Sequence, residues 1–139
     1  MTIPTDRFVS ETTFFVRYAE TDTMGIVHHS NYLVYCEELR SQYARDRGSN
    51  YADFEKQGLA LAVSEIHLRY IAPAVYGQRI TIIGWVEEIK SRRVTFGYQI
   101  LNPDTGIIHV TGTTSHICIN REGQVARIPE DWLERWHVK

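Results

Sequence analysis

The sequence has few cysteines, no excess of basic residues and no long apolar run, and each absence excludes a class of protein. Its 139 residues include only Cys36 and Cys118, too far apart for a CxxC metal site and too few for a disulfide framework. We expect two buried free thiols in a reducing cytoplasm. The formal net charge of -2 disfavours broad nucleic-acid binding, which needs a basic face. No stretch approaches the roughly 20 apolar residues of a membrane span, and residues 1–8 do not have the pattern of a signal peptide.

Several enzyme motifs are also missing. The sequence has no G-x-S-x-G, G-x-G-x-x-G, G-x-x-x-x-G-K-[ST] or H-E-x-x-H run, which disfavours the usual serine hydrolases, Rossmann enzymes and P-loop enzymes. His28 and His29 are a poor metal pair, because adjacent residues point in different directions on a regular element. No third ligand is obvious, so we expect neither a metal nor a cofactor.

The first third of the chain predicts a strand followed by a long helix. Alternating apolar residues predict the strand over residues 12–18, and a loop follows it. Ser30 or Asn31 can cap a helix that runs to about Arg47, and Gly48 is a natural stop. An apolar stripe with spacings of 4, 3 and 4 predicts that this helix is substantially buried, and its members are Tyr32, Cys36, Leu39 and Tyr43, widened by Val34 and Tyr35.

The rest of the chain predicts a short helix, four strands and a last short helix. The short helix covers residues 51–57, with Asn50 as its cap and Gly58 at its end. Beyond Gly58 the apolar period changes to two, with turn signals at 73–77, 102–106 and 121–123, and Pro129 opens a helix that runs through Trp136. Short turns demand antiparallel neighbours, so we predict one α+β domain over residues 1–139 with a five-stranded antiparallel sheet.

Residues 17–32, RYAETDTMGIVHHSNY, hold the strongest candidate for a site. They place an acid, a flexible glycine, a histidine pair and a helix start within a few residues. A helix start offers unpaired N–H groups and the positive end of the helix dipole. Most loop aspartates only cap a turn, but Gly25 lets the loop fold tightly around a ligand, and His29 follows Asp22 by seven residues. Asp22 is therefore the candidate catalytic carboxylate.

The same segment resembles the signature of the hotdog-fold acyl-CoA thioesterases of the 4-hydroxybenzoyl-CoA thioesterase family. The TD-x-x-G-x-V-x-H run is its most specific part. The resemblance continues through Glu38 and Arg40, residues 69–74, Gly77 and residues 127–129, and so covers nearly the whole chain. Hotdog dehydratases carry a His-Pro motif at the helix instead, and the segment here lacks that proline.

The resemblance implies a hotdog fold, in which the sheet wraps around the long central helix, and hydrolysis of acyl-CoA to a free acid and coenzyme A. It makes Asp22 the general base or the nucleophile, and it places His29 and Tyr18 beside the thioester. Backbone N–H groups from Val27 to Asn31 become the oxyanion donors. A thiolate is a good leaving group, so one carboxylate with an oxyanion site suffices chemically.

The resemblance also implies a homo-oligomer, a dimer or a dimer of dimers, with active sites at the subunit interface. We expect acyl-CoA as the partner, and neither nucleic acid nor membrane. A cluster of basic residues at a predicted hairpin either reaches the coenzyme A phosphates or is an ordinary solvated tip, and its members are Lys90, Arg92 and Arg93.

Some residues have two interpretations that the sequence leaves open. Five aromatic residues suit an apolar acyl pocket or an ordinary core: Tyr32, Tyr35, Tyr70, Trp85 and Phe96. The histidines outside the motif are expected to be structural or solvent-facing: His67, His109, His116 and His137. Two alternatives to an acyl-CoA thioesterase also remain. One is another hotdog enzyme, such as an acyl-carrier-protein thioesterase or a dehydratase, and the other is a non-catalytic acyl-CoA-binding module.

Overall fold

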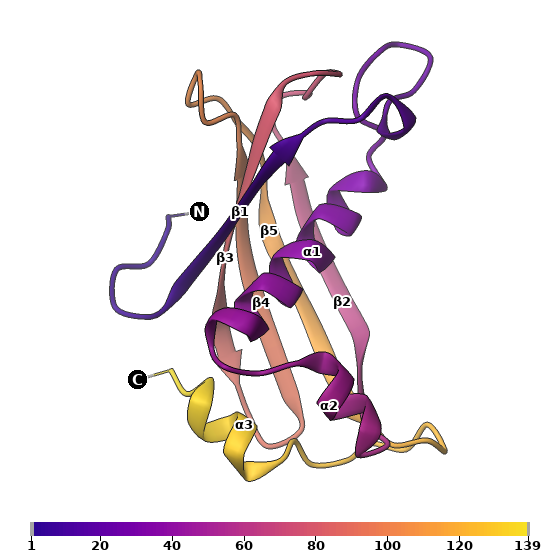
Figure 1. The fold of residues 1–139 in the computed structure, drawn as a ribbon, viewed down its shortest axis with the longest axis vertical. Coiled ribbons are helices and arrows are strands. Elements are labelled where there is room, and N and C mark those ends of the chain that lie inside the picture. The colour runs from indigo at the N-terminus through magenta and orange to yellow at the C-terminus, as the bar shows by residue number, and fades with distance from the viewer. Residues whose placement is uncertain (1, 139) are drawn as a thin grey trace.

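The computed structural model describes residues 2–138, which form an antiparallel sheet with a long helix against one face (Figure 1). In chain order the elements are β1 (Val9–Phe15), the 3-10 helix η1 (Tyr18–Glu20), α1 (Asn31–Asp46), α2 (Tyr51–Lys56), β2 (Ala60–Tyr70), β3 (Arg79–Ile89), β4 (Arg93–Leu101), β5 (Ile108–Ile119) and α3 (Glu130–Arg135). The sheet order is β1-β3-β4-β5-β2, and every neighbouring pair is antiparallel. The predicted α+β class and the five antiparallel strands are confirmed.

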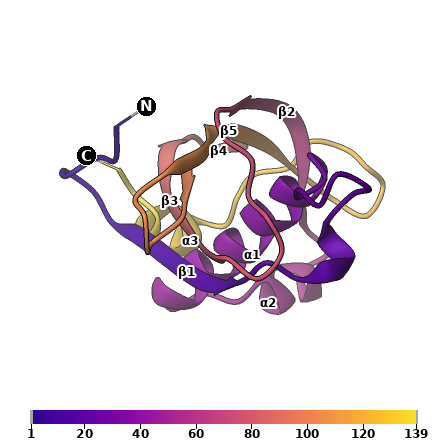
Figure 2. The same ribbon diagram turned by 90° about the horizontal axis from the view of Figure 1, so that it is seen from above.

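The sheet curves around α1, as the view from above shows (Figure 2). The predicted apolar stripe of α1 is buried against the inner faces of β3, β4 and β5. The helix packs tightly on Gly84 of β3, where an added Cβ would overlap the Leu39 side chain. The prediction that Val34 widens the stripe is wrong within this chain. Val34 is about half-exposed, because it lies five residues before Leu39 and thus about 140° around the helix.

The first strand ends earlier than predicted. The alternating pattern extended it to Tyr18, but β1 stops at Phe15 and Tyr18 begins η1. The Glu20 carboxylate accepts a hydrogen bond from the Arg17 backbone N–H at 2.8 Å and forms an ion pair with the Arg17 guanidinium. These two interactions close a turn after β1. A local capping interaction therefore overrides the period-two pattern.

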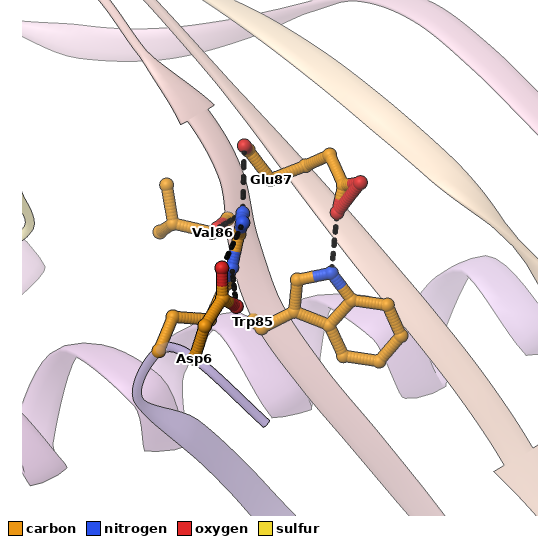
Figure 3. Close-up of polar contacts among 5 residues, drawn as sticks. Asp6, Trp85, Val86 and Glu87 are labelled. Atoms are coloured by element: carbon orange, nitrogen blue, oxygen red, sulfur yellow. Dashed lines mark hydrogen bonds and ion pairs between the residues drawn. The ribbon is translucent and has the colours of Figure 1, made fainter. Parts of the chain in front are cut away.

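The outer face of the sheet holds Trp85. Ile80, Ile82 and Val86 on β3 are buried toward α1, so Trp85 at an odd position faces the other way. It is buried against Gly97, and its Nε1 donates to the Glu87 carboxylate at 2.5 Å (Figure 3). Trp85 therefore belongs to sheet packing and not to a pocket beside α1.

The two ends of the sheet differ in what covers them. The loop of residues 21–30 lies at one end, and α2, α3 and the β3–β4 hairpin lie at the other (Figure 1). Arg79 pairs with Phe15 next to the loop, and Lys90 at the hairpin follows Arg79 by eleven residues. A strand advances ~3.3 Å per residue, so these ends are about 36 Å apart. No helix in residues 2–138 is both long and apolar enough to cross a membrane.

Candidate active site at the start of the central helix

The predicted site loop is held against the chain that follows β2. A short bridge pairs Ile26 with Val75, and the Val27 N–H donates to the Ala74 carbonyl at 2.9 Å. A second bridge, between Thr21 and Val27, closes the loop on itself. A cavity of about 240 Å³ opens between the two segments. It is lined by Asp22, Ile26, Val27, His29 and Tyr32 from the loop and α1, and by residues 70–73 from the other side. The cavity is thus lined both by residues that the motif predicted as site residues and by residues that it did not predict.

Asp22 has one carboxylate oxygen engaged and one free. Its Oδ1 accepts the Met24 N–H at 2.8 Å, and its backbone N–H donates to the Ile26 carbonyl at 2.8 Å. Gly25 completes this turn with a φ of 78°, the left-handed conformation that glycine adopts without strain. The second oxygen, Oδ2, has no hydrogen-bond partner within residues 2–138, and the residue lines the cavity. The turn therefore fixes the carboxylate while one oxygen stays available for chemistry.

Glu20 anchors this loop to α1, and sequence reasoning missed it. Its buried carboxylate accepts the Tyr35 hydroxyl at 2.8 Å, and its backbone carbonyl accepts the His28 N–H and the Asn31 side-chain amide, both at 2.9 Å. Burial by itself would raise the pKa of Glu20, but the hydrogen bonds from Arg17 and Tyr35 prevail and hold the pKa below its ordinary value. Glu20 stays ionised as the central acceptor beneath the loop. The spacing of Arg17 and Glu20, three residues apart, is the sequence signal that could have indicated this interaction.

The free backbone donors at the helix start are fewer than the resemblance suggests. The Val27 and His28 amides donate to Ala74 and Glu20, and the Asn31 amide donates to the His28 carbonyl. Ser30 occupies the N-cap without a side-chain cap bond, since its hydroxyl contacts His28 Nδ1 at 2.8 Å. Across residues 2–138 no acceptor takes the backbone N–H groups of His29 and Tyr32, and both residues line the cavity.

The two motif histidines have different surroundings. Their rings lie 4.2 Å apart, but His28 turns toward Ser30, whereas His29 lines the cavity near Tyr70. The Tyr70 hydroxyl donates to the His29 carbonyl at 3.3 Å, so Tyr70 closes the cavity from β2. Of the five aromatic candidates for an acyl pocket, only Tyr32 and Tyr70 line this cavity. Tyr35 and Phe96 are buried in the core beside α1, and Trp85 is buried on the outer face of the sheet.

Tyr18 lies outside the cavity of its own chain. Its side chain is 76% exposed and packs edge-on against Tyr76, with ring centroids 5.7 Å apart. Gly25 and Asn31 also do not line the cavity, and they shape the loop through its turn and through the bond to Glu20. Asp22, Val27 and His29 are thus the predicted site residues that the fold brings together.

The predicted phosphate-binding cluster lies at the far end of the sheet. Lys90 and Arg93 pair with Glu88 at 3.8 and 3.3 Å, and the Arg92 guanidinium contacts the Ser91 hydroxyl at 3.2 Å. The hairpin is about 36 Å from the loop end of its own sheet. It cannot reach a ligand that lies in the Asp22 cavity of the same chain.

Comparison with known proteins places this geometry in a family. Residues 16–136 match the model of the thioesterase-like superfamily. The chain is 39% identical over 128 residues to the putative acyl-CoA thioesterase YneP of Bacillus subtilis, and this match covers 89% of this chain and 92% of that protein. A crystal structure of a DHNA-CoA thioesterase from Staphylococcus aureus superimposes with a TM-score of 0.88 at 34% identity, covering 92% of this chain and 88% of the other.

A more distant relative has a different type of substrate in its name. The chloroplastic acyl-acyl carrier protein thioesterase ATL3 of Arabidopsis thaliana is 27% identical over 85 residues, 61% of this chain and 45% of that protein. The family model, the close relative and the superposition agree on the fold and on the general chemistry. The chain belongs to the thioesterase-like superfamily and has its hotdog fold.

Proposed function

We propose that the protein is an acyl-CoA thioesterase that hydrolyses acyl-CoA to a free acid and coenzyme A. The observation that carries the proposal is that one cavity is lined by Asp22, which has a free carboxylate oxygen, and by His29 and Tyr32, whose backbone N–H groups are free. The N–H groups are suited to hold the thioester oxygen as it gains negative charge. The family membership and the names of the close relatives support the same reaction.

The mechanism has two forms that share the same residues. As a general base, Asp22 takes a proton from water while the water oxygen attacks the thioester carbon. As a nucleophile, Asp22 attacks the carbon itself and forms an anhydride that water then hydrolyses. In both forms the His29 and Tyr32 amides hold the oxyanion, the C–S bond breaks, and the sulfur leaves as a thiolate. We propose His29 as a side chain that contacts the thioester from the cavity wall.

We propose that a second copy of the chain completes the site. The β2 strand is an edge of the sheet, and its Val63, Ile66 and Tyr70 side chains are about half-exposed. An open, apolar edge strand favours pairing with another strand. A symmetric antiparallel pairing centred on β2 would set Ala60 of one copy opposite Tyr70 of the other. The hairpin end of each copy would then lie on the same side as the Asp22 end of its neighbour.

In that dimer we propose that Lys90, Arg92 and Arg93 of one copy meet the coenzyme A phosphates of substrate bound to the other. Of the three, we expect Arg92 to contact the phosphates most directly, because Glu88 already pairs with Lys90 and Arg93. Tyr18 would likewise meet substrate only through the assembled site. We keep the cytoplasm as the proposed compartment, since both cysteines are free and buried.

The test is a set of acyl-CoA substrates assayed for release of free thiol, with the same acyl groups on an acyl carrier protein as a second arm. Hydrolysis of the CoA series supports the proposal. Faster hydrolysis of the carrier-protein series would make the protein a carrier-protein thioesterase instead. Binding of acyl-CoA without thiol release would identify a binding module and contradict the proposed reaction.

A further inference from the structure

A second cavity lies at the other end of α1, and the proposed reaction makes no use of it. It has a volume of about 300 Å³ and opens between α1, α2 and the start of β2. Arg40 on its wall follows Asn31 by nine residues, so it lies roughly 14 Å farther along the helix than the start that faces Asp22. The two cavities of one chain are therefore separate.

The wall of this cavity contains a directional chain of hydrogen bonds. The Arg40 guanidinium donates to the Tyr98 hydroxyl at 3.1 Å, Tyr98 contacts Thr114 Oγ1 at 2.6 Å, and Thr114 contacts His116 Nε2 at 2.8 Å. Arginine only donates, so Tyr98 accepts from Arg40, and each hydroxyl in the row finds an acceptor when Tyr98 donates to Thr114 and Thr114 donates to His116. Nε2 of His116 then accepts, which leaves the ring proton on Nδ1.

The cavity wall consequently carries donors without acceptors. Burial, helped by the charge of Arg40, lowers the pKa of His116 to about 3, so the ring is neutral and its Nδ1–H has no partner within residues 2–138. The buried Tyr51 hydroxyl also lacks a partner. Arg40 forms no ion pair with any carboxylate in that part of the chain. Glu37 and Glu55 line the cavity but are exposed, so solvent screens their charge.

A partly buried guanidinium without a counter-ion, beside two unpaired donors, favours an anionic acceptor. We propose that this cavity binds a carboxylate, which accepts hydrogen bonds from Arg40 and from the Tyr51 hydroxyl. A carboxylate oxygen accepts only, so it matches the unpaired donors on this wall, and its bonds to arginine are charge-assisted. The volume lies at the small end of ligand pockets and suits a short organic acid.

The carboxylate has two possible sources. It is either a free small carboxylic acid or the distal carboxylate of an acid-terminated acyl group bound at the Asp22 cavity of a second copy. In the β2-paired dimer proposed above, the Ala60 end of β2, which lines this cavity, faces the Tyr70 end of the other copy, which lines the Asp22 cavity. The acyl source thus rests on the proposed function, while the free-acid source does not.

The first arm of the test measures thermal stabilisation of the intact protein by glutarate. Glutaramide, of the same length but uncharged, is the ligand control at equal ionic strength. We expect glutarate at about ten times its dissociation constant to raise the melting temperature by roughly 3–6 °C, and glutaramide to leave it unchanged. Arg40→Gln should lose the shift, and Arg45→Gln, an exposed arginine on the same helix, should keep it.

The second arm compares glutaryl-CoA with pentanoyl-CoA, which has the same chain length without the carboxylate. If the acyl group is the source, the ratio of the two kcat/KM values should fall by on the order of tenfold or more in Arg40→Gln. A glutarate shift without an acyl preference assigns the cavity to a free acid. A protein that binds glutarate but hydrolyses no thioester would refute the proposed reaction and leave this site standing.

The proposal is overturned if wild-type protein shows neither a glutarate shift larger than that of glutaramide nor a preference for glutaryl-CoA. An equal glutarate shift in wild type and Arg40→Gln would also overturn it, because the anion would then bind elsewhere. If Arg40→Gln does not fold, Tyr51→Phe replaces it. That variant removes only the unpartnered hydroxyl, and an unchanged glutarate shift in it would contradict the proposed contact.

Discussion

Replacing Glu20 with glutamine tests whether this buried carboxylate holds the site loop. Its Oε1 accepts the Arg17 N–H and the Tyr35 hydroxyl, and its Oε2 accepts the Arg17 guanidinium. In Glu20→Gln the first two bonds weaken from charged to neutral, at about 0.5–1 kcal/mol each. The exposed Arg17 guanidinium also loses a charged partner, but solvent screens that pair and its loss adds little. We expect the variant to lose about 1–2 kcal/mol of the free energy of unfolding, or roughly 3–6 °C in melting temperature.

Activity should fall with stability, since Asp22 lies two residues beyond Glu20. A loop displacement on the order of 1 Å can cost up to about 100-fold in rate, so we expect kcat for thiol release to fall at least severalfold. Tyr35→Phe removes one hydrogen bond and should show a smaller version of both effects. Glu122→Gln, in an exposed turn, is the matched control and should change neither. Glu20→Gln with wild-type melting temperature and kcat would refute the anchoring role.

The same variant has a pH signature. The pKa of Glu20 in the folded protein is lowered from its ordinary value of 4.5, so the carboxylate stabilises the fold above that pH. This contribution is lost as the pH falls below about 4.5 and through the folded pKa. Wild-type protein should therefore lose more stability than Glu20→Gln between pH 5 and pH 3, as followed by denaturant unfolding at each pH. Parallel curves would show that Glu20 does not titrate as described.

Three further expectations concern packing, the basic hairpin and assembly. Gly84→Ala should destabilise the protein by about 1–3 kcal/mol in denaturant unfolding, because its Cβ would meet the Leu39 side chain, and a Leu39→Ala background should recover part of the loss. Arg92→Ala with Arg93→Ala should raise KM for acyl-CoA more than it lowers kcat, less so at high salt, and should spare a short thioester that lacks the nucleotide; equal losses on both substrates would assign these arginines to structure. Light scattering at low micromolar concentration should show a dimer or larger species, and a clean 16.1 kDa monomer would contradict the proposed β2 pairing.

Local sequence patterns predicted most of the fold, because each pattern reports directly on a local element. The apolar stripe that begins at Tyr32 predicted a buried α1, and glycine and asparagine placed its ends and those of α2. The pattern did not reveal that β1 ends at Phe15, because the Glu20 carboxylate that turns the chain acts through its side chain. Apolar character alone made Trp85 a candidate for the acyl pocket, although the alternation of Ile80, Ile82 and Val86 places Trp85 on the other face of β3.

The candidate site was predicted in part for the same reason. Asp22 and His29 belong to one short motif, so they could be chosen without knowing the fold. The contribution of Tyr70 could not be predicted from the motif, since Tyr70 reaches the cavity only because β2 ends beside the loop. The chain from Arg40 to His116 joins α1 to the sheet across 76 residues of sequence, and no local pattern indicates it.

Thioester hydrolysis by Asp22→Asn compared with wild type tests the central claim most directly. Asparagine keeps an acceptor for the Met24 N–H, so the turn should survive, but it cannot act as base or nucleophile. Thiol release from the best acyl-CoA should fall by on the order of 10²–10⁴-fold, with an unchanged circular dichroism spectrum. Asp53→Asn, at an exposed position on α2, should keep wild-type turnover. Near-wild-type turnover by Asp22→Asn would remove this carboxylate from the mechanism and contradict the account.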